Sequence, residues 1–563
     1  MKFITTEIPS LPSRHHQTNT MKKLYILTTT FFPVLLICYT GLSQVTEQWA
    51  TRYNGPDSKN DQARLIATDA SGNVIVSGTS GSKKGGFAYI TTVKYNAANG
   101  VQQHIARYSG PSNTAGNEYP YALAVDNAGN VYITGRSMGT GSNVDIVTIK
   151  YNSSLVEQWV VRFNGSDNMN DIPGDIKVAR SGNVYVTGLT GSDNPGSTIG
   201  KAIVTLKLNP LTGAPQPGFP VYYDALPTGS QEQGVSLDLD GNENIYITGV
   251  SAGMVTIKYN LSGQLLWART IVGGNGRKVL IDGGNNVLVS GWGGKIGKYD
   301  TNGTPIWQSN SSLPTGSFSD MALDGIGNIY VTGTCNGIND RSDYVTAKYN
   351  PNGTEQWIKS FNGSSNSTDI GRSIALDGSG SVYVTGYTSV NDGSRNGGTN
   401  YGTVKYNNDG EQQWVALYDG LDKNGGHAYG VVTDAAGNLY VTGESANKTN
   451  IDYATVKYSQ GNALKASFTN LVENSPISRF ELRNYPNPFS KNTTIEYQLA
   501  NEGKVKLSVF NLSGHEITTL VNEYKSAGTY KINLKTNMLS AGTYFYRIQS
   551  GEYIETKKLI ILR

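Results

Sequence analysis

The stretch Asn130-Val131-Tyr132-Ile133-Thr134-Gly135 returns along the chain with small changes, and its repetition decides the fold. Each copy is rich in β-branched and aromatic residues and ends in glycine, which is typical of a strand that stops at a turn. Successive copies lie about 40 to 60 residues apart, which is the period of a repeat fold. The copies end at Gly78, Gly135, Gly188, Gly249, Gly291, Gly333, Gly386 and Gly443.

Residues 121–163 show one complete repeat. It reads as four short strands, namely strand A at 122–126, strand B at 130–135, strand C at 145–152 and strand D at 158–163. In strands A and B, apolar residues occupy both the odd- and the even-numbered positions, whose side chains point to opposite faces of the sheet. This pattern predicts strands that are covered on both faces. Four short strands in each repeat of this length predict an all-β protein built as a β-propeller.

The repeats also predict how many blades the propeller has and how it closes. Strand C recurs eight times as a variant of Thr-Val-Lys-Tyr-Asn, and seven of these copies are followed by a strand D. The copy that ends at Tyr458 has none, whereas Gln48–Tyr53 at the other end matches the strand D pattern. We therefore expect an eight-bladed propeller over residues 44–459, closed by the N-terminal strand, because closure removes edges that invite aggregation. Strand D carries Trp159, Trp267, Trp307, Trp357 and Trp414, with His104 and Phe219 near the equivalent positions.

Residues 48–459 resemble the bacterial β-propeller repeat family named for seven-bladed propellers. The segments (A)-x-D-x-x-G-N-V-Y-V-T-G and T-x-K-Y-N carry the resemblance. It implies a propeller fold but no particular activity, because propellers host many unrelated functions. The family name implies seven blades whereas this chain shows eight units, so both counts stay open.

The composition agrees with a turn-rich β protein. Among 563 residues there are 67 Gly and 35 Tyr, and charged residues make up only 16%. The net charge of +3 gives no basic signal for nucleic acid. Of the two cysteines, Cys38 lies in the leader and Cys335 stands alone, so we expect no intramolecular disulfide and interpret Cys335 as a small core or loop residue.

The N-terminal segment predicts secretion. Residues 21–43 combine the basic start Met21-Lys22-Lys23, an apolar stretch and a small-residue site at Gly41-Leu42-Ser43, which indicates a signal peptide cleaved after Ser43. The stretch is too short and polar for a span of about 20 apolar residues, so we expect no transmembrane span in the mature protein. Residues 1–20 are interpreted as an over-extended start. A lipoprotein anchored at Cys38 is a weaker alternative, because Ile37 is large for that position.

The repeat stops after Ser459, and residues 460–482 are interpreted as a linker. Alternating segments at 494–499, 505–511, 529–534, 543–548 and 553–562 predict a small β-sandwich over residues 483–563. Through 485–489, 511–514, 539–544 and 557–561 this segment resembles the C-terminal sorting domain of type IX secretion cargo, subtype A. The resemblance implies export through the inner and outer membranes, contact with the type IX machinery, and a secreted or surface location. Cleavage of the tail with anchoring to lipopolysaccharide, and retention without cleavage, are both open.

One aspartate recurs at the turn between strands A and B. A carboxylate there can accept hydrogen bonds from the turn, and its repetition favours a structural role over catalysis. Ala179 takes this place in the third repeat. Asp145, Asp343 and Asp452, which open strand C, are interpreted likewise as loop caps. The repeated residues are Asp69, Asp126, Asp240, Asp282, Asp324, Asp377 and Asp434.

Binding is expected on one face of the propeller. The A–B and C–D turns share one face and are short, whereas the variable B–C and D–A loops share the other, and variable loops on a rigid scaffold are where binding usually occurs. The similar, oxygen-rich D–A loops 54–61, 164–171 and 362–369 could hold Ca²⁺, although none has a dedicated calcium spacing. The metal site therefore stays unknown, and no other cofactor is expected.

No catalytic residue is assigned. His104, His427 and His515 form no zinc pattern or catalytic triad, and only His427, just before strand A of the last blade, is expected near the loop face. We expect a secreted or surface binding protein for a glycan or protein ligand. The alternatives are a polysaccharide lyase or glycosidase, or a passive component of the surface layer. Hydrolysis needs two carboxyl groups about 5–10 Å apart, and the non-repeating candidates are Asp193, Asp392 and Asp422.

Overall fold

The computed structural model separates the chain into two units, residues 1–464 and 465–563. It describes residues 45–562 apart from 461–480 and short segments at 83–87, 112–117, 140–142, 167, 192–200, 226–231, 313–315, 337–340, 364–366, 390–397, 421–424, 486, 488, 500–501, 512–514, 527, 536–538 and 552. The predicted signal peptide at 21–43 and most of the predicted linker lie outside the described residues. Within the described part, no helix has the length and apolar character needed to cross a membrane.

The described residues of the first unit form eight four-stranded antiparallel sheets, called blades 1 to 8 here. Blades 1 to 4 are β2 (Asp61–Thr68), β3 (Val74–Gly81), β4 (Ala88–Tyr95), β5 (Gln102–Tyr108); β6 (Tyr119–Val125), β7 (Val131–Met138), β8 (Val144–Tyr151), β9 (Glu157–Phe163); β10 (Ile172–Val178), β11 (Val184–Thr190), β12 (Ala202–Leu208), β13 (Val221–Tyr223); and β14 (Gln233–Leu239), β15 (Ile245–Val250), β16 (Met254–Tyr259), β17 (Leu265–Ile271).

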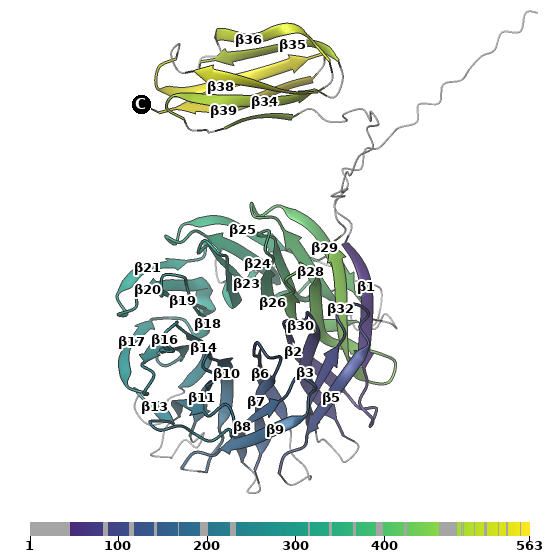
Figure 1. The fold of residues 1–563 in the computed structure, drawn as a ribbon, viewed down its shortest axis with the longest axis vertical. Coiled ribbons are helices and arrows are strands. Elements are labelled where there is room, and N and C mark those ends of the chain that lie inside the picture. The colour runs from purple at the N-terminus through teal and green to yellow at the C-terminus, as the bar shows by residue number, and fades with distance from the viewer. Residues whose placement is uncertain are drawn as a thin grey trace, which may run out of the picture. The chain divides into compact units, whose positions relative to one another are not determined.

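Blades 5 to 8 follow the same order of strands A, B, C and D. They are β18 (Gly276–Ile281), β19 (Val287–Gly291), β20 (Lys295–Tyr299), β21 (Pro305–Asn310); β22 (Ser317–Leu323), β23 (Ile329–Asn336), β24 (Ser342–Tyr349), β25 (Glu355–Phe361); β26 (Asp369–Leu376), β27 (Val382–Ser389), β28 (Thr399–Tyr406), β29 (Gln412–Tyr418); and β30 (Gly426–Thr433), β31 (Leu439–Ala446), β32 (Ile451–Gln460), β1 (Val45–Tyr53). A short 3-10 helix, η1 (Trp292–Gly294), links β19 to β20. Figure 1 shows the blades around a common axis, with the A strands β2, β6, β10, β14, β18, β26 and β30 innermost.

The core lies between blades, around the B and C strands. Residues 131–135 of β7 are all buried, which confirms the prediction that strand B is covered on both faces. The repeated glycine lies within strand B, where β7 continues past Gly135 to Met138. A close approach requires it, because a Cβ at Gly135 would collide with the carbonyl oxygen of Tyr119 on the neighbouring strand A. The equivalent glycines of the other seven blades meet a strand A or D–A loop carbonyl in the same way.

A lysine on strand C ties its blade to the next one. In blade 2, Lys150 Nζ donates to the carbonyl of Pro210 in blade 3 at 2.8 Å, and Trp159 Nε1 donates to the same oxygen at 3.2 Å. We call this arrangement the lysine clamp. Lys94, Lys207, Lys258, Lys298, Lys348 and Lys457 donate equivalently to the following C–D turn.

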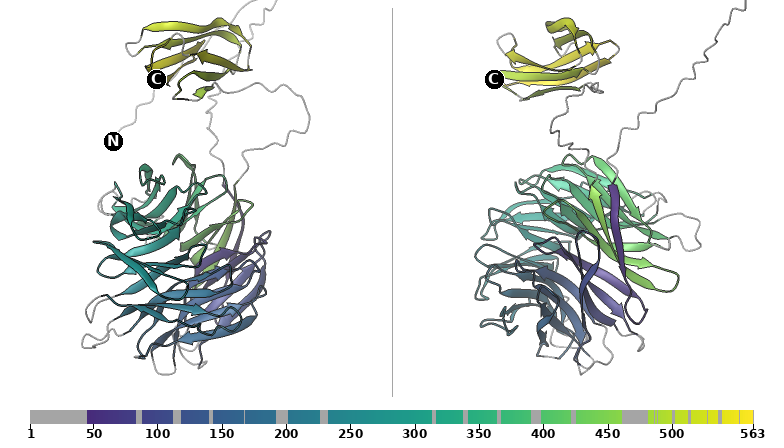
Figure 2. Two further views of the ribbon diagram at one scale, coloured as in Figure 1. Left: turned by 60° about the vertical axis from the view of Figure 1, so that its left-hand side comes forward. Right: turned by 45° about the vertical axis from the view of Figure 1, so that its right-hand side comes forward.

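Blade 8 is assembled from both ends of the propeller. β1 pairs antiparallel with β32, with Tyr53 opposite Tyr453, and the right-hand view of Figure 2 shows the purple β1 beside the green strands. The lysine clamp also runs from blade 8 to blade 1, since Lys457 Nζ and Trp49 Nε1 both donate to the carbonyl of Ala97, at 2.9 and 3.2 Å.

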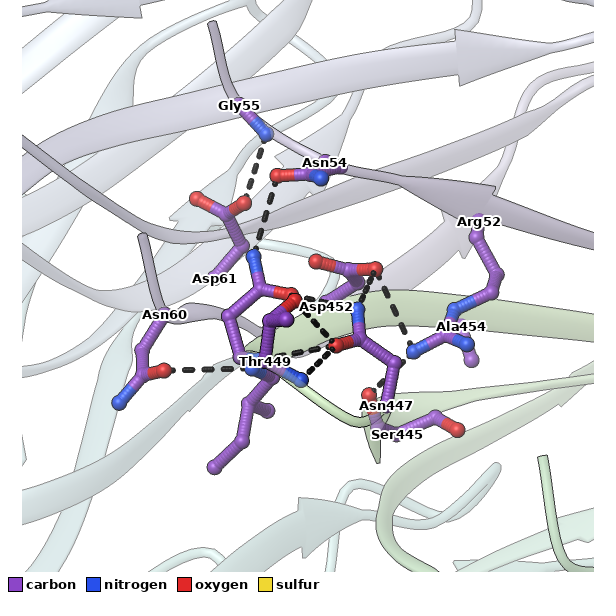
Figure 3. A network of polar contacts seen from close by, with 12 residues as sticks. Arg52, Asn54, Gly55, Asn60, Asp61, Ser445, Asn447, Thr449, Asp452 and Ala454 are labelled. Atoms are coloured by element: carbon purple, nitrogen blue, oxygen red, sulfur yellow. Dashed lines mark hydrogen bonds and ion pairs between the residues drawn. The ribbon is translucent and has the colours of Figure 1, made fainter. Parts of the chain in front are cut away.

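A polar network joins the same two blades on the loop face (Figure 3). Asn450 Nδ2 donates to Asn54 Oδ1 at 3.3 Å, and the backbone amide of Ile451 donates to Asn60 Oδ1 at 3.2 Å. Arg52 of β1 forms an ion pair with Asp452 of β32, with Nη2 and Oδ2 3.3 Å apart. Contacts on both faces of the ring therefore hold the N-terminal strand in place.

The second unit is a two-sheet β-sandwich. Its sheets are β33 (Glu481–Tyr485), β34 (Asn492–Leu499), β37 (Gly528–Lys535), and β36 (Glu516–Lys525), β35 (Gly503–Phe510), β38 (Gly542–Ser550), β39 (Tyr553–Ile561). The two strands that sequence patterning did not predict are β33 and β36. β36 is mostly exposed and polar, so its apolar alternation is weak, and β33 begins inside the predicted linker at 460–482. The packed side chains include Ile495, Leu507 and Tyr546.

Deleting residues 48–53 tests the closure. The deletion removes the partner of β32 and the Trp49 side of the lysine clamp, so we expect a lower melting temperature and aggregation through the exposed edge. Loss of a buried Trp costs about 3–5 kcal/mol, and we expect the lower end of this range because Trp49 is only half-buried. Differential scanning calorimetry with Thr46→Ala, at an exposed position of β1, as the control measures the effect. An unchanged melting temperature without aggregation would contradict the closure.

Candidate functional site

The short-turn face is built from the repeated aspartates. Asp126 Oδ1 accepts hydrogen bonds from the backbone amides of Ala128 and Asn130 at 2.9 and 2.8 Å, and the Tyr132 hydroxyl donates to Oδ2 at 3.1 Å. The other six aspartates accept the same two hydrogen bonds, from the backbone amides two and four residues further along the chain. This geometry confirms their interpretation as turn acceptors.

Two of the aspartates also form an ion pair with a clamp lysine. In blades 1 and 5 strand B has no tyrosine at the usual position, and there the lysine pairs directly with the aspartate, as in Lys298–Asp282 with Nζ and Oδ2 2.9 Å apart. Burial acts to raise the pKa of Asp282, but hydrogen bonds from Asn286 and Lys298 hold it below its ordinary value. In blade 3, where Ala179 replaces the aspartate, the Tyr185 hydroxyl donates instead to Glu243 of the next blade at 3.0 Å.

The three similar D–A loops share one internal contact. The aspartate at the end of each loop accepts a hydrogen bond from a backbone amide near the start of the same loop. The pairs are Gly55 to Asp61, Gly165 to Asp171 and Gly363 to Asp369, at 2.6 to 2.8 Å. Within the described residues, no group of three or more His, Cys, Asp or Glu side chains is placed to hold a metal. Calcium binding by the other loop oxygens stays a prediction.

The other candidates from the sequence have separate locations. Asp193, Asp392 and Asp422 lie outside the described residues. Cys335 is buried in β23, and burial raises the pKa of its thiol to about 11, which fits a core residue. Asp145 and Asp452 form ion pairs with arginines of strand D, while Asp343 lies at the start of β24. His104 is exposed on β5 and His515 is exposed just before β36.

The A strands β2, β18, β22, β26 and β30 line a cavity of about 650 Å³ on the inner side of the blades. Its lining includes Arg64, Lys278, Asp320, Arg372 and Tyr429. Lys278 Nζ lies 3.8 Å from Asp320 Oδ1. Burial would lower the pKa of Lys278, but the surrounding carboxylates, above all that of Asp320, raise it. This part of the lining is therefore internally neutralised.

A second group of polar side chains, at the loop-face end of the same cavity, is not neutralised in this way. It comes from blades 7, 8, 1 and 2, and its members stack guanidinium groups on aromatic rings. We call it the mouth cluster: Arg64, Tyr119, Arg136, Arg372, Tyr387, His427, Tyr429 and Glu444.

Tyr429 is at the centre of the mouth cluster. The guanidinium carbons of Arg64 and Arg372 lie 4.8 and 5.5 Å from the centroid of its ring. Arg372 also lies 5.6 Å from the ring of Tyr387. Burial raises the pKa of Tyr429 to about 12, with Glu444 acting in the same direction and both arginines against it.

One carboxylate oxygen of the acidic side chain in the cluster is paired, whereas the other, Glu444 Oε2, is buried without a hydrogen-bond partner. Glu444 is buried, and its Oε1 lies 2.8 Å from Nδ1 of His427, whose ring centroid is 4.4 Å from that of Tyr387. His427 lies within β30, not before it as the sequence suggested, but it does lie on the loop-face side. Among the described residues, Arg64, Arg136 and Arg372 form no ion pair, and the Nε atoms of Arg64 and Arg136 are buried without a hydrogen-bond partner. Positive charge therefore dominates the mouth.

Tyr119 and His427 lie opposite Arg136 and Glu444 of strand B. The other six residues of the mouth cluster come from two positions of the blade. One is the single bulge residue of strand A, such as Arg64, Arg372 or Tyr429, which opposes no residue of strand B. Bulges commonly redirect a side chain. The other is the residue directly after the repeated glycine, such as Arg136, Tyr387 or Glu444. Sequence analysis missed these residues because it followed what repeats, whereas the signal here is variation between blades at two fixed positions.

Blade 5 carries a related pair at the same two positions. Arg277 is the bulge residue of β18, and Trp292 follows the repeated glycine; the guanidinium carbon is 4.5 Å from the ring centroid. Burial lowers the pKa of Arg277, with no carboxylate opposing it. Trp292 keeps 46% of its surface exposed. The Arg372–Tyr387 pair of blade 7 thus has a counterpart elsewhere on the rim.

Comparisons with known proteins support both resemblances. Residues 356–394 match the beta-propeller repeat family, and residues 483–562 match the secretion system C-terminal sorting domain. The sorting domain indicates export by type IX secretion to the cell surface or the medium, and it implies contact with the secretion machinery. No curated protein matches the chain.

Several solved structures show a similar arrangement of strands. BamB from Moraxella catarrhalis is 15% identical, with a TM-score of 0.44 over 74% of this chain and 100% of that one. Sqt1 from Chaetomium thermophilum is 10% identical, with a TM-score of 0.48 over 74% and 99%. The Dos1 propeller is 7% identical, with a TM-score of 0.47 over 74% and 96%. At these identities we draw nothing about function from them.

The substitution Asp282→Ala tests the structural role of the short-turn face. It removes the partner of a buried lysine, and hydrogen bonds to charged groups contribute about 1.5–3 kcal/mol, so we expect a loss of this size at pH 7. Because the folded pKa is lowered, the wild-type advantage is present above the ordinary value of 3.8 and is lost as the pH falls below it. Urea unfolding at several pH values measures this. The exposed Asp409→Ala serves as a control, and equal effects of the two variants would contradict the assignment.

Removing residues 483–563 tests the export signal. We expect the truncated chain to keep its propeller but to disappear from the cell surface and the medium, because it lacks the sorting domain. Cell fractionation with immunodetection measures its location, and Arg180→Ala, at an exposed position of a propeller turn, is the control. Normal surface display of the truncated chain would contradict the assignment.

Proposed function

We propose that this chain is an exported binding protein whose propeller captures an extracellular glycan or protein at the mouth of its inner cavity. The observation that carries the proposal is the contrast between the two faces. On the short-turn face the same aspartates repeat in seven of eight blades and are used for turn bonds. At the mouth, side chains that differ between blades come together, and the scaffold does not need them there.

The state of the mouth residues supports binding. Guanidinium groups stacked on aromatic rings are held in place before a ligand arrives, so less conformational entropy is lost on binding. Among the described residues the arginines form no ion pair; Arg64 Nη2 donates to Gln62 Oε1 at 3.2 Å, but this partner is neutral and leaves the positive charge for an anionic ligand. The cavity volume lies within the range of about 300–1,000 Å³ that is common for ligand sites.

The mouth cluster gives less support to the glycosidase alternative. Glycoside hydrolysis normally uses two carboxyl groups, whereas the cluster holds one, Glu444, which faces His427. A lyase would need one base and a group that neutralises a substrate carboxylate, so turnover must be measured and not assumed. A passive structural role predicts no specific ligand.

Screening the purified full-length protein on glycan and protein arrays tests the proposal. We expect a specific hit that survives washing and is released unchanged, as shown by chromatography of the recovered ligand. Recovery of a cleaved or unsaturated product would favour the enzyme. The absence of a binding signal on both arrays would contradict the binding proposal and favour the structural role.

A further inference from the structure

We propose that the mouth cluster binds an acidic oligosaccharide, and that the guanidinium groups of Arg64 and Arg372 bind the carboxylates of its uronic-acid units. This inference rests on the proposed function and names the ligand class of that same site. It follows from three features of the mouth, namely uncompensated charge, paired aromatic faces, and the recurrence of one arginine–aromatic pair in two blades.

The positive charge of the arginines at the mouth favours an anionic ligand. Arg64, Arg136 and Arg372 lie within one chain of stacked rings, and their only acidic neighbour in the cluster, Glu444, contacts His427. A guanidinium group that stacks on a ring leaves its N–H edge free to donate two parallel hydrogen bonds to a carboxylate. Lys278 deeper in the cavity faces Asp320 and is already neutralised. The free positive charge is therefore at the entrance.

The aromatic rings favour a sugar over an acidic peptide. A pyranose ring presents an apolar C–H face that packs on an aromatic side chain, and a uronic acid carries its carboxylate on that same ring. Trp292, which keeps 46% of its surface exposed, offers such a surface beside Arg277, whereas the rings of Tyr387 and Tyr429 already stack on Arg372. An aspartate or glutamate side chain would bind a guanidinium group but would leave the exposed surface of Trp292 uncovered.

The counterpart in blade 5 indicates more than one sugar unit. Arg277 and Trp292 repeat the arrangement of Arg372 and Tyr387 at the same two positions of a different blade. Residues of β18 in blade 5 and of β2 in blade 1 line the same cavity. Figure 1 shows β18 and β2 on opposite sides of the propeller axis. A chain of uronic acids that crosses the mouth would meet both arginine–aromatic pairs, whereas one monosaccharide would meet only one.

Titration calorimetry with defined uronic-acid oligosaccharides tests the inference. The panel consists of tetramers of galacturonate, glucuronate, mannuronate and guluronate. Fully methyl-esterified tetragalacturonate is the uncharged control, and tetraglutamate is the peptide control. The full-length wild-type protein is compared with Arg372→Ala, Arg64→Lys and Trp292→Ala. Arg180→Ala, on the short-turn face, is the matched control, and a thermal melt of each variant verifies the fold.

We expect at least one uronate tetramer to bind, with affinity that falls as salt rises, and neither control ligand to bind. Arg372→Ala should weaken binding about 10- to 100-fold, as expected for a lost charge-assisted pair of hydrogen bonds. Arg64→Lys should weaken it less, because the charge remains while the two-pronged geometry is lost. Trp292→Ala should also weaken it, and Arg180→Ala should not.

Each other outcome has a definite meaning. If only neutral glycans or a protein bind at the loop face, the proposed function stands and this inference is wrong. If the methyl ester binds as well as the free acid, the carboxylate is not what the site recognises. If tetraglutamate binds as well, the sugar ring is not what the site recognises. Equal effects of Arg372→Ala and Arg180→Ala would move the site away from the mouth. If no uronate tetramer and no array ligand binds, both proposals are wrong.

Discussion

The propeller depends on a positive charge that is buried between each blade and the next. A clamp lysine such as Lys258 has only 5% of its surface exposed, and it donates to the following C–D turn. A buried charge is tolerated only with partners, and each hydrogen bond to a charged group contributes about 1.5–3 kcal/mol. The aspartate of the A–B turn, the tyrosine of strand B and the tryptophan of strand D all surround this lysine. In blade 4 these four side chains form one connected group, whereas other blades replace one of them, as Ala179 replaces the aspartate in blade 3.

The same requirement divides the molecule into two chemically different faces. The clamp lysines, joined by the aspartate in seven of the eight blades, occupy the short-turn half of the propeller, so that half has little freedom to vary. On the other half, the bulge residue of strand A and the residue after the repeated glycine satisfy no clamp. Arg64 and Arg372 are bulge residues, and Tyr387 follows a repeated glycine. Ligand chemistry can therefore differ from blade to blade without disturbing the packing between blades.

Repetition made most of the fold predictable from sequence. The four strands of each repeat, the pairing of Gln48–Tyr53 with the last strand C and the acceptor role of Asp126 follow from local patterns. The site was harder to predict, because Arg64 and Tyr429 are about 365 residues apart and meet only when the first and last blades become neighbours. β36 was missed for a different reason, since its exposed polar residues hide the alternation.

The position of β1 also sets an order of events during synthesis. Tyr53 pairs with Tyr453, so the first strand has no partner until almost all of the propeller has been made. Contacts of such long sequence separation form late and slowly. The sorting domain at 483–562 follows the last blade and is translated after it. A chain that ends within the propeller therefore lacks both the completed ring and the sorting domain that directs export.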